Sequence, residues 1–141
     1  MSYRIGGLLF YIVAVFSYAQ DQKPEVKQAP PPVTSAQSGK QMFHAYCASC
    51  HGAGGKGDGP AAPALKSQPT DLTALSRNNG GKFPADRLLS ILRGQATVSA
   101  HGSREMPVWG PVFWHMSEGH ETEVQQRITN LSRYIESQQA K

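Results

Sequence analysis

The hydrophobic pattern begins with one continuous apolar run near the N-terminus. Residues 5–16 read I-G-G-L-L-F-Y-I-V-A-V-F; Arg4 precedes them and the small-x-small sequence Ser17-Tyr18-Ala19 follows them. A positive charge, a short apolar run and a small-residue site are typical of a secretory signal peptide, so we predict that residues 1–19 are removed by cleavage after Ala19. An uncleaved membrane anchor is the alternative, but the run is short for that role, since a bilayer span needs about 20 apolar residues. No later stretch of the sequence is long enough to cross a bilayer.

Three later segments repeat apolar residues every three or four positions, which is the spacing of one face of a helix. We predict helices that begin at Ser38, run from about Pro84 to Arg93, and run from about Glu121 to Ser137. Gln41 stands at the capping-box distance from Ser38, and Gly94 provides a stop for the second helix. The apolar positions on the three faces are Met42, Phe43, Tyr46, Cys47 and Cys50; Leu88, Leu89, Ile91 and Leu92; and Val124, Ile128, Leu131 and Ile135. No run is typical of a strand, so we expect an all-α domain.

Two segments outside these helices are rich in proline, glycine and small polar residues. Residues 20–37 cannot bury enough apolar surface to offset the entropy of ordering them, so we predict a flexible, proline-rich arm. The folded domain then covers residues 38–141. Roughly thirty residues separate the first two predicted helices, and a loop of that length is usually functional or folded around something.

Composition and charge narrow the function classes. A chain of 141 residues predicts one domain, and its formal charge of +4 at pH 7 comes from basic residues that are scattered along the sequence. Scattered basic residues argue against a nucleic-acid-binding patch. The 2 cysteines are separated by two residues, so a disulfide between them would close a very small loop and stabilise the chain little. The pair therefore needs a chemical explanation.

The sequence Cys47-Ala48-Ser49-Cys50-His51 supplies that explanation. Positions i and i+3 of a helix project from one face, roughly 5–6 Å apart at Cβ, so two thiols placed there can bond the two vinyl groups of one haem. His51 can then take an axial position on the iron, and Cys-x-x-Cys-His is a signature of c-type haem attachment. A redox dithiol belongs beside a βαβ pattern, which we do not find, and a structural zinc site needs four ligands with a second arm. We therefore predict one covalent haem c on Cys47 and Cys50.

The second axial ligand must come from a methionine or a histidine elsewhere in the chain. The candidates are Met42, Met106, Met116, His44, His101, His115 and His120. Those on the first predicted helix cannot easily reach the far face of the ring. Met106 lies in a loop between the second and third helices, and Pro107 biases its backbone towards an extended conformation, which stiffens the approach of the thioether to iron. We predict Met106 as the ligand, with Met116 and His101 as the next candidates.

The motif Gly39-x-x-x-Phe43-x-x-x-Cys47-x-x-Cys50-His51-Gly52 resembles the first helix of class I cytochrome c. Later motifs are similar to those of small bacterial monohaem cytochromes, namely the glycine-rich loop 54–60, Asp71-Leu72-Thr73, Phe83-Pro84, His101-Gly102, Met106-Pro107-Val108-Trp109-Gly110 and Leu131-x-x-Tyr134-Ile135. The resemblance covers nearly all of residues 38–137. It implies an all-α cytochrome c fold, with three to four helices and long loops wrapped around one covalently bound haem, in which Gly39 and Phe43 meet Leu131 and Tyr134.

The same resemblance implies roles for residues around the haem. The carbonyl of Pro60, or failing that of Pro63, would accept the second ring N–H of His51, as expected for a metal-bound histidine. Candidates to hold the haem propionates are Trp109, Arg87 and Arg93. The stretch 110–123 departs from the family pattern, because it is longer and more aromatic than a plain turn into the last helix.

Histidine plus methionine ligation fills both axial positions of the iron and favours its ferrous state, which suits a one-electron carrier. No acid/base pair or nucleophile accompanies the predicted haem, so we expect an electron-transfer protein rather than an enzyme. Its expected partners are periplasmic or other extracytoplasmic redox proteins, such as a membrane respiratory complex or a dehydrogenase. The alternatives are a haem-bearing electron-transfer subunit of a dehydrogenase or oxidase complex, and a binding module built on a Cys47–Cys50 disulfide.

Overall fold

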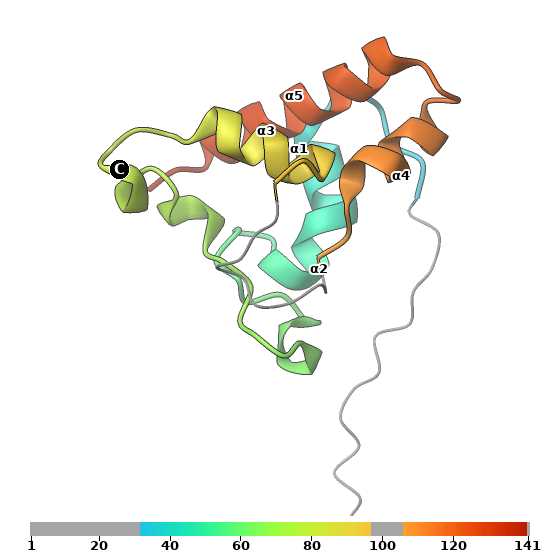
Figure 1. The fold of residues 1–141 in the computed structure, drawn as a ribbon. Coiled ribbons are helices and arrows are strands. Elements are labelled where there is room, and N and C mark those ends of the chain that lie inside the picture. The colour runs from blue at the N-terminus through green and yellow to red at the C-terminus, as the bar shows by residue number, and fades with distance from the viewer. Residues whose placement is uncertain (1–31, 97–105, 141) are drawn as a thin grey trace, which may run out of the picture.

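The computed structural model describes residues 32–96 and 106–140, which fold into helices joined by long loops (Figure 1). In chain order the elements are α1 (Gly39–Met42), the π-helix η1 (Phe43–Cys47), α2 (Ala48–His51), the 3-10 helices η2 (Ala62–Ala64), η3 (Leu72–Ala74) and η4 (Arg77–Asn79), α3 (Ala85–Arg93), α4 (Trp109–Met116) and α5 (Glu121–Ser137). These two ranges contain no strand, so the predicted all-α fold is confirmed. Within the same ranges, no helix is both long and apolar enough to cross a membrane. The predicted signal peptide and His101 lie outside the described residues.

The first predicted helix begins as expected and then changes its winding. The Ser38 hydroxyl accepts a hydrogen bond from the Gln41 backbone N–H (3.1 Å), which caps α1. After Met42 the helix widens into the π-helix η1, which the residue spacing does not predict, and it returns to α-helical winding in α2. It ends at Gly52, where a backbone φ of +78° favours glycine.

The second and third predicted helices are confirmed as α3 and α5. Gly94 ends α3 in the left-handed conformation, with its N–H donating to the Ile91 carbonyl. α5 has the predicted bounds and buries the predicted apolar stripe. The sequence pattern does not predict α4, which occupies part of the stretch 110–123. This helix packs through Trp109 and Phe113, one turn apart, whose side chains are both buried.

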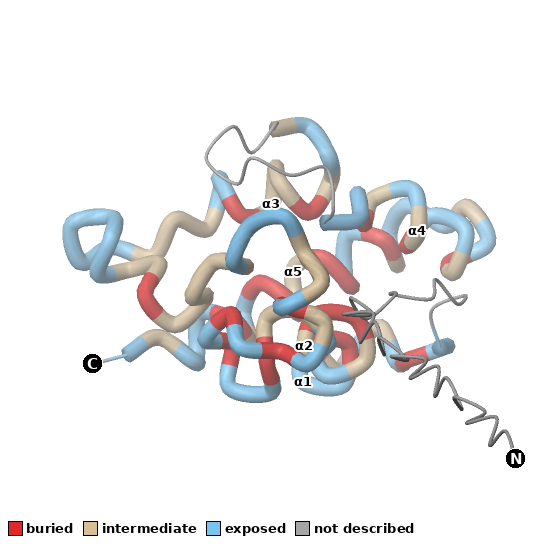
Figure 2. Tube along the Cα trace, turned by 90° about the horizontal axis from the view of Figure 1, so that it is seen from below, coloured by how far each residue is buried: buried red, intermediate tan, exposed pale blue. Residues whose placement is uncertain are grey.

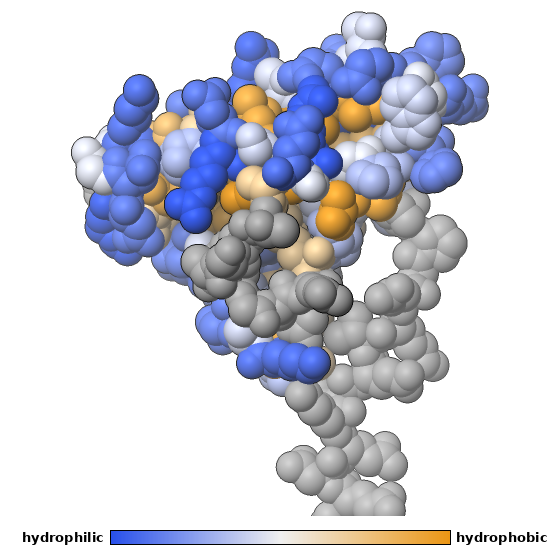
Figure 3. Space-filling model, viewed as in Figure 1, coloured by the Kyte–Doolittle hydropathy of each residue, from blue (hydrophilic) through white to orange (hydrophobic). Residues whose placement is uncertain are grey.

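The core lies where α5 packs against α1 on one side and α3 on the other (Figure 2). The α1–α5 crossing is tight at Gly39, since a Cβ added there would lie 2.7 Å from the carbonyl carbon of Asn130 and 2.9 Å from the Cβ of Tyr134. One turn later the buried Phe43 ring lies 5.3 Å from the Tyr134 ring. The contact predicted between the first and last helices is therefore present. On the face shown in Figure 3, hydrophilic side chains cover most of α3 and α5, with hydrophobic patches between them.

The last residues of the predicted flexible arm lie against α5. Thr34 is only 6 % exposed, and its carbonyl accepts a hydrogen bond from Arg127 Nη1 (2.9 Å). Two residues later the Ala36 carbonyl accepts from Asn130 Nδ2 (3.0 Å). The docked part of the chain therefore begins before residue 38, because α5 presents two side-chain donors that pair with backbone carbonyls of this segment.

Candidate functional site

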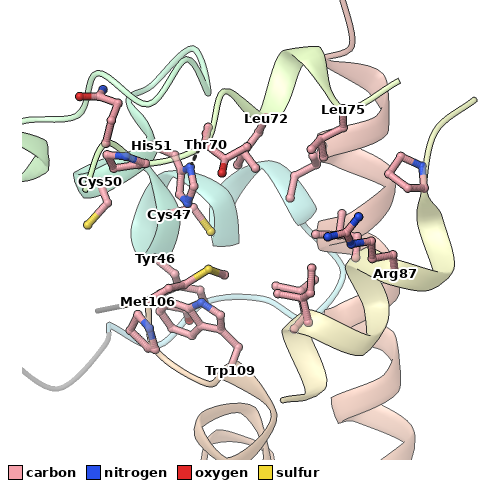
Figure 4. Close-up of a pocket in the computed structure, with 18 of the residues that line it drawn as sticks. Tyr46, Cys47, Cys50, His51, Thr70, Leu72, Leu75, Arg87, Met106 and Trp109 are labelled. Atoms are coloured by element: carbon pink, nitrogen blue, oxygen red, sulfur yellow. Dashed lines mark hydrogen bonds between the residues drawn. The ribbon is translucent and has the colours of Figure 1, made fainter. Parts of the chain in front are cut away.

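A cavity of about 370 Å³ lies between α2, α3 and the loop that follows α2, and we call it the α2–α3 cavity (Figure 4). From the first helix it is lined by Tyr46, Cys47, Cys50 and His51. From the loop the lining residues include Leu65, Gln68, Pro69, Thr70, Leu72 and Leu75, and from α3 they are Arg87, Leu88, Ile91 and Leu92. Met106, Pro107 and Trp109 also line it. A largely apolar cavity with a few polar groups at its edge is typical of a cofactor site.

Both cysteines of the sequence motif reach this cavity as free thiols. Cys47 ends η1 and is buried, whereas Cys50 lies in α2 and is partly exposed. Burial, with a smaller contribution from the charge of Cys50, raises the pKa of Cys47 to about 12. The Cys47 thiol is therefore protonated at neutral pH in the folded chain.

His51 is the last residue of α2, and its ring is held by the backbone of the following loop. Its Nδ1 lies 2.9 Å from the carbonyl oxygen of Thr70. A carbonyl can only accept, so Nδ1 carries the proton, and the lone pair is then on Nε2, as a metal-ligating histidine requires. The sequence-based expectation of Pro60, or Pro63, as the acceptor is therefore wrong in this structure.

The path of the loop explains why Thr70 replaces the expected acceptor. Near its start, the Gly59 and Ala61 N–H groups donate to carbonyls of Cys50 and Ser49, which holds exposed Pro60 alongside α2. The chain then returns past the histidine at Thr70, where the next residue, Asp71, caps η3 by accepting from the Thr73 N–H (2.9 Å). The sequence signal for this return was an aspartate two residues before a threonine, a capping pattern that we did not connect with His51.

Met106 is the candidate sulfur ligand that lines the cavity, where it is 37 % exposed. Met42 is buried in the core beside α5, and Met116 packs against the core at the end of α4. Figure 4 shows Met106 beside Tyr46 and Trp109, below His51 and Thr70 in that view. The structure thus brings two thiols, an imidazole and a thioether from separate segments to one cavity.

Of the three candidates for propionate binding, two line the cavity and one does not. Arg87 and Trp109 both line the α2–α3 cavity, and Arg87 lies on the opposite side of the view from the cysteines (Figure 4). Arg93 does not line it; its Nη1 lies 3.4 Å from Glu121 Oε1 instead. The expected role of Arg93 at the propionates therefore stays a prediction without support from the cavity lining.

Sequence reasoning also missed polar residues on the wall of the cavity. Asn78 and Asn79 line it from η4, and the Asn79 side chain donates to the Lys82 carbonyl (2.7 Å). They lie in a loop without helical periodicity, so no pattern could assign them to one face. No group of three or more His, Cys, Asp or Glu side chains that could hold a metal ion by themselves is found among the residues that the structure describes.

Comparison with known families identifies the family of this chain. A family model described as cytochrome C oxidase, cbb3-type, subunit III matches residues 34–120, which is more than half of the chain. The chain belongs to this family. It contains a c-type cytochrome domain, so haem c is its cofactor and haem-based electron transfer is its chemistry. No curated protein and no solved structure matches the chain significantly.

The residues of the α2–α3 cavity fit this cofactor. The donor set of two thiols, one imidazole and one thioether is the set that c-type haem uses for attachment and axial ligation. Apolar side chains such as Leu72, Leu88 and Leu92 line the space beside them. Domains of this kind typically work outside the cytoplasm with redox partners in respiratory chains.

Proposed function

We propose that this protein is a one-electron carrier whose haem c is attached through Cys47 and Cys50. The observation that carries the proposal is the convergence of these two thiols, His51 and Met106 on one apolar cavity. The axial pair comes from segments 55 residues apart in the chain (106 minus 51), so their meeting depends on the fold and not on local sequence alone.

The chain's own residues would divide the work as follows. When bound, the haem supplies a ferric/ferrous couple that accepts and releases one electron. The His51 and Met106 side chains would hold the haem iron and would leave no position for a substrate, while the Thr70 carbonyl holds the His51 ring in the ligating tautomer. Thioether ligation by Met106 favours the ferrous state and so raises the reduction potential.

The remaining lining residues would orient the cofactor and exclude water. Arg87 provides a cation at the cavity wall and Trp109 an indole N–H, which suits both side chains to the haem propionates. Leu88 and Leu92 are buried along the α3 side of the cavity and lower its local dielectric. Burial of the iron in such a site is one of the factors that set its potential.

We further propose that the chain works in the periplasm, with residues 1–19 as a cleaved signal peptide and, of the predicted arm 20–37, the part before the docked segment as a tether. Its partners are then a redox protein donor and a redox protein acceptor, such as a periplasmic dehydrogenase and a membrane respiratory complex. The family description favours a second candidate, in which this domain is the haem-bearing subunit of an oxidase complex. Native purification distinguishes the two candidate functions. A carrier purifies from the periplasmic extract as a single chain, whereas an oxidase subunit purifies from the membrane together with its complex.

The test of the haem site uses the exported holo-protein and three single variants. His51→Ala is expected to abolish holo-protein. Met106→Ala is expected to keep the covalent haem, to lose the methionine-to-iron charge-transfer band of the ferric protein, to lower the midpoint potential and to bind CO. The matched control is Met116→Ala, which removes a methionine that does not line the α2–α3 cavity. An unchanged spectrum and potential for Met106→Ala, or normal haem yield for His51→Ala, would show that these ligand assignments are wrong.

A further inference from the structure

Tyr46 lines the α2–α3 cavity, and its hydroxyl is hydrogen-bonded to the segment that precedes α1. The side chain is 7 % exposed, and its hydroxyl donates to the Pro32 carbonyl at 2.8 Å. The same oxygen lies 2.5 Å from Thr34 Oγ1. The Tyr46 hydroxyl has a single proton, and it donates that proton to the Pro32 carbonyl. The Thr34 hydroxyl must therefore be the donor in its hydrogen bond with the Tyr46 oxygen. Both anchors belong to the segment that docks on α5.

Arg127 fixes the other side of Thr34. This residue of α5 is 3 % exposed, and its Nη1 donates to the Thr34 carbonyl (2.9 Å) and lies 3.4 Å from the Thr34 hydroxyl. Its Nε donates to Ser117 Oγ (3.2 Å), and its Nη2 lies 2.6 Å from Glu123 Oε1. A buried guanidinium is costly to leave unpaired, so this arrangement resists displacement and holds Thr34 in place.

The anchored Tyr46 ring contacts Trp109, which lines the same cavity. Its centroid lies 5.3 Å from that of Trp109, and the Trp109 and Phe113 rings stack at 5.7 Å with an interplanar angle of 27°. Trp109 is the first residue of α4 and follows Met106 by three positions. Between them, Val108 is 51 % exposed, so Trp109 is the first buried residue after the proposed ligand.

We propose that Tyr46, anchored by Thr34 and Arg127, is a positioning residue for Met106, acting through Trp109. This inference rests on the proposed haem site. The exposed segment after Met106 gains little from packing, so its position depends on where Trp109 holds the chain. Phenylalanine would fill the same space as Tyr46, but it would lack the hydroxyl that ties the ring to the docked segment. The hydroxyl therefore keeps the thioether close to the iron and limits its dissociation.

The experiment measures how readily free imidazole displaces Met106 from the ferric holo-protein. The apparent Kd for imidazole falls as the fraction of protein with a dissociated methionine rises. Tyr46→Phe removes two hydrogen bonds, one to Pro32 and one from Thr34. It is expected to keep the covalent haem and to tighten imidazole binding by at least about 2- to 10-fold, the factor by which losing one hydrogen bond shifts an equilibrium. Tyr134→Phe is the matched control, since it also removes a tyrosine hydroxyl, but from a ring at the α1–α5 crossing.

Two further comparisons separate positioning from general destabilisation. Thr34→Val removes the donor to Tyr46 but leaves the hydrogen bond to Pro32, so it is expected to tighten imidazole binding by less than Tyr46→Phe does. Thr34→Ser keeps a hydroxyl and is expected to match the wild type. Ile128→Val weakens the core of α5 at a residue outside the cavity wall, so it is expected to lower thermal stability and leave imidazole binding unchanged.

The outcomes distinguish this inference from the proposed function. If wild-type protein carries haem with a methionine-to-iron band, and Tyr46→Phe and Thr34→Val bind imidazole as the wild type does, the positioning role is refuted. Equal tightening in Thr34→Ser or Ile128→Val would also refute it, because the hydroxyl would then not be the cause. A wild-type protein without haem, or without the methionine band, would instead overturn the proposed function itself.

Discussion

Gly39→Ala tests the packing of the haem-bearing helix against the last helix. The added Cβ would overlap the carbonyl oxygen of Asn130 and lie 2.7 Å from its carbon, where ordinary contact begins at 3.4 Å. Both groups belong to backbone, so no side-chain rotation relieves the overlap. α1 must instead move away from α5 by at least 0.7 Å (3.4 minus 2.7), and Phe43 and Tyr134 move apart with it.

Two opposing effects set the magnitude. Alanine in place of glycine favours the helix by about 1 kcal/mol. Overpacking of a well-packed core costs typically 1–3 kcal/mol, and a clash with backbone belongs at about the upper end of that range. We therefore expect Gly39→Ala to lower the free energy of unfolding by about 2 kcal/mol. For a domain of this size, that corresponds to a fall in Tm of roughly 8–16 °C.

The assay is thermal and urea unfolding of the holo-protein, followed by haem absorbance and far-ultraviolet circular dichroism. The matched control is Gly54→Ala, because a Cβ at Gly54 would have no neighbour within 4 Å and its φ is not in the left-handed region. That control is expected to change stability by no more than about 1 kcal/mol, in the stabilising direction. A Gly39→Ala protein that melts with the wild type, or a Gly54→Ala protein that loses as much, would refute the packing argument.

Two further predictions concern charged side chains beside the site. Hydrogen bonding from the Thr73 side chain holds the pKa of Asp71 below its ordinary value, so its contribution to stability is present above the unfolded-state pKa of 3.8 and is lost as pH falls through the lower folded value. Asp71→Asn should therefore lower Tm at neutral pH and reduce the fall of Tm between neutral and acid pH. Asp86→Asn is the control, and an unchanged dependence of Tm on pH would contradict this prediction. Arg93→Gln should leave the midpoint potential unchanged and alter the free energy of unfolding by less than about 1 kcal/mol, because its contact with Glu121 is long and solvent-exposed; a shifted potential would return Arg93 to the haem.

The helices with a strict repeat and a clear stop were predictable from sequence. α3 ends at Gly94 and α5 carries an unbroken stripe, so local pattern and tertiary packing agree there. α4 was not predictable, because Gly110 and Pro111 have low helix propensity and the helix is held by contacts of Trp109 and Phe113 with Tyr46. The π-helical winding of η1 was not predictable either, since its apolar residues keep the three- and four-residue spacing of an α-helix.

The candidate site also has residues that the sequence indicates and groups that only the fold selects. Cys47, Cys50 and His51 could be proposed from sequence because their chemistry fixes their spacing, whereas Met106 could be proposed only by comparing it with its rivals. The Thr70 carbonyl could not be found, since every residue has a carbonyl and only the path of the loop selects one. Two arginines six positions apart on α3 point about 120° apart around the helix, so the sequence alone could not tell which of them faces the cavity.

The α1–α5 crossing has a consequence for the order of events in the life of this protein. It joins Gly39 to Asn130, residues 91 positions apart (130 minus 39), so the core cannot close until the final helix has been synthesised. Once it closes, Cys47 is 7 % exposed and its thiol is protonated at neutral pH, so it is a poor nucleophile. We therefore expect the proposed haem attachment at this sulfur to precede closure of the α1–α5 crossing.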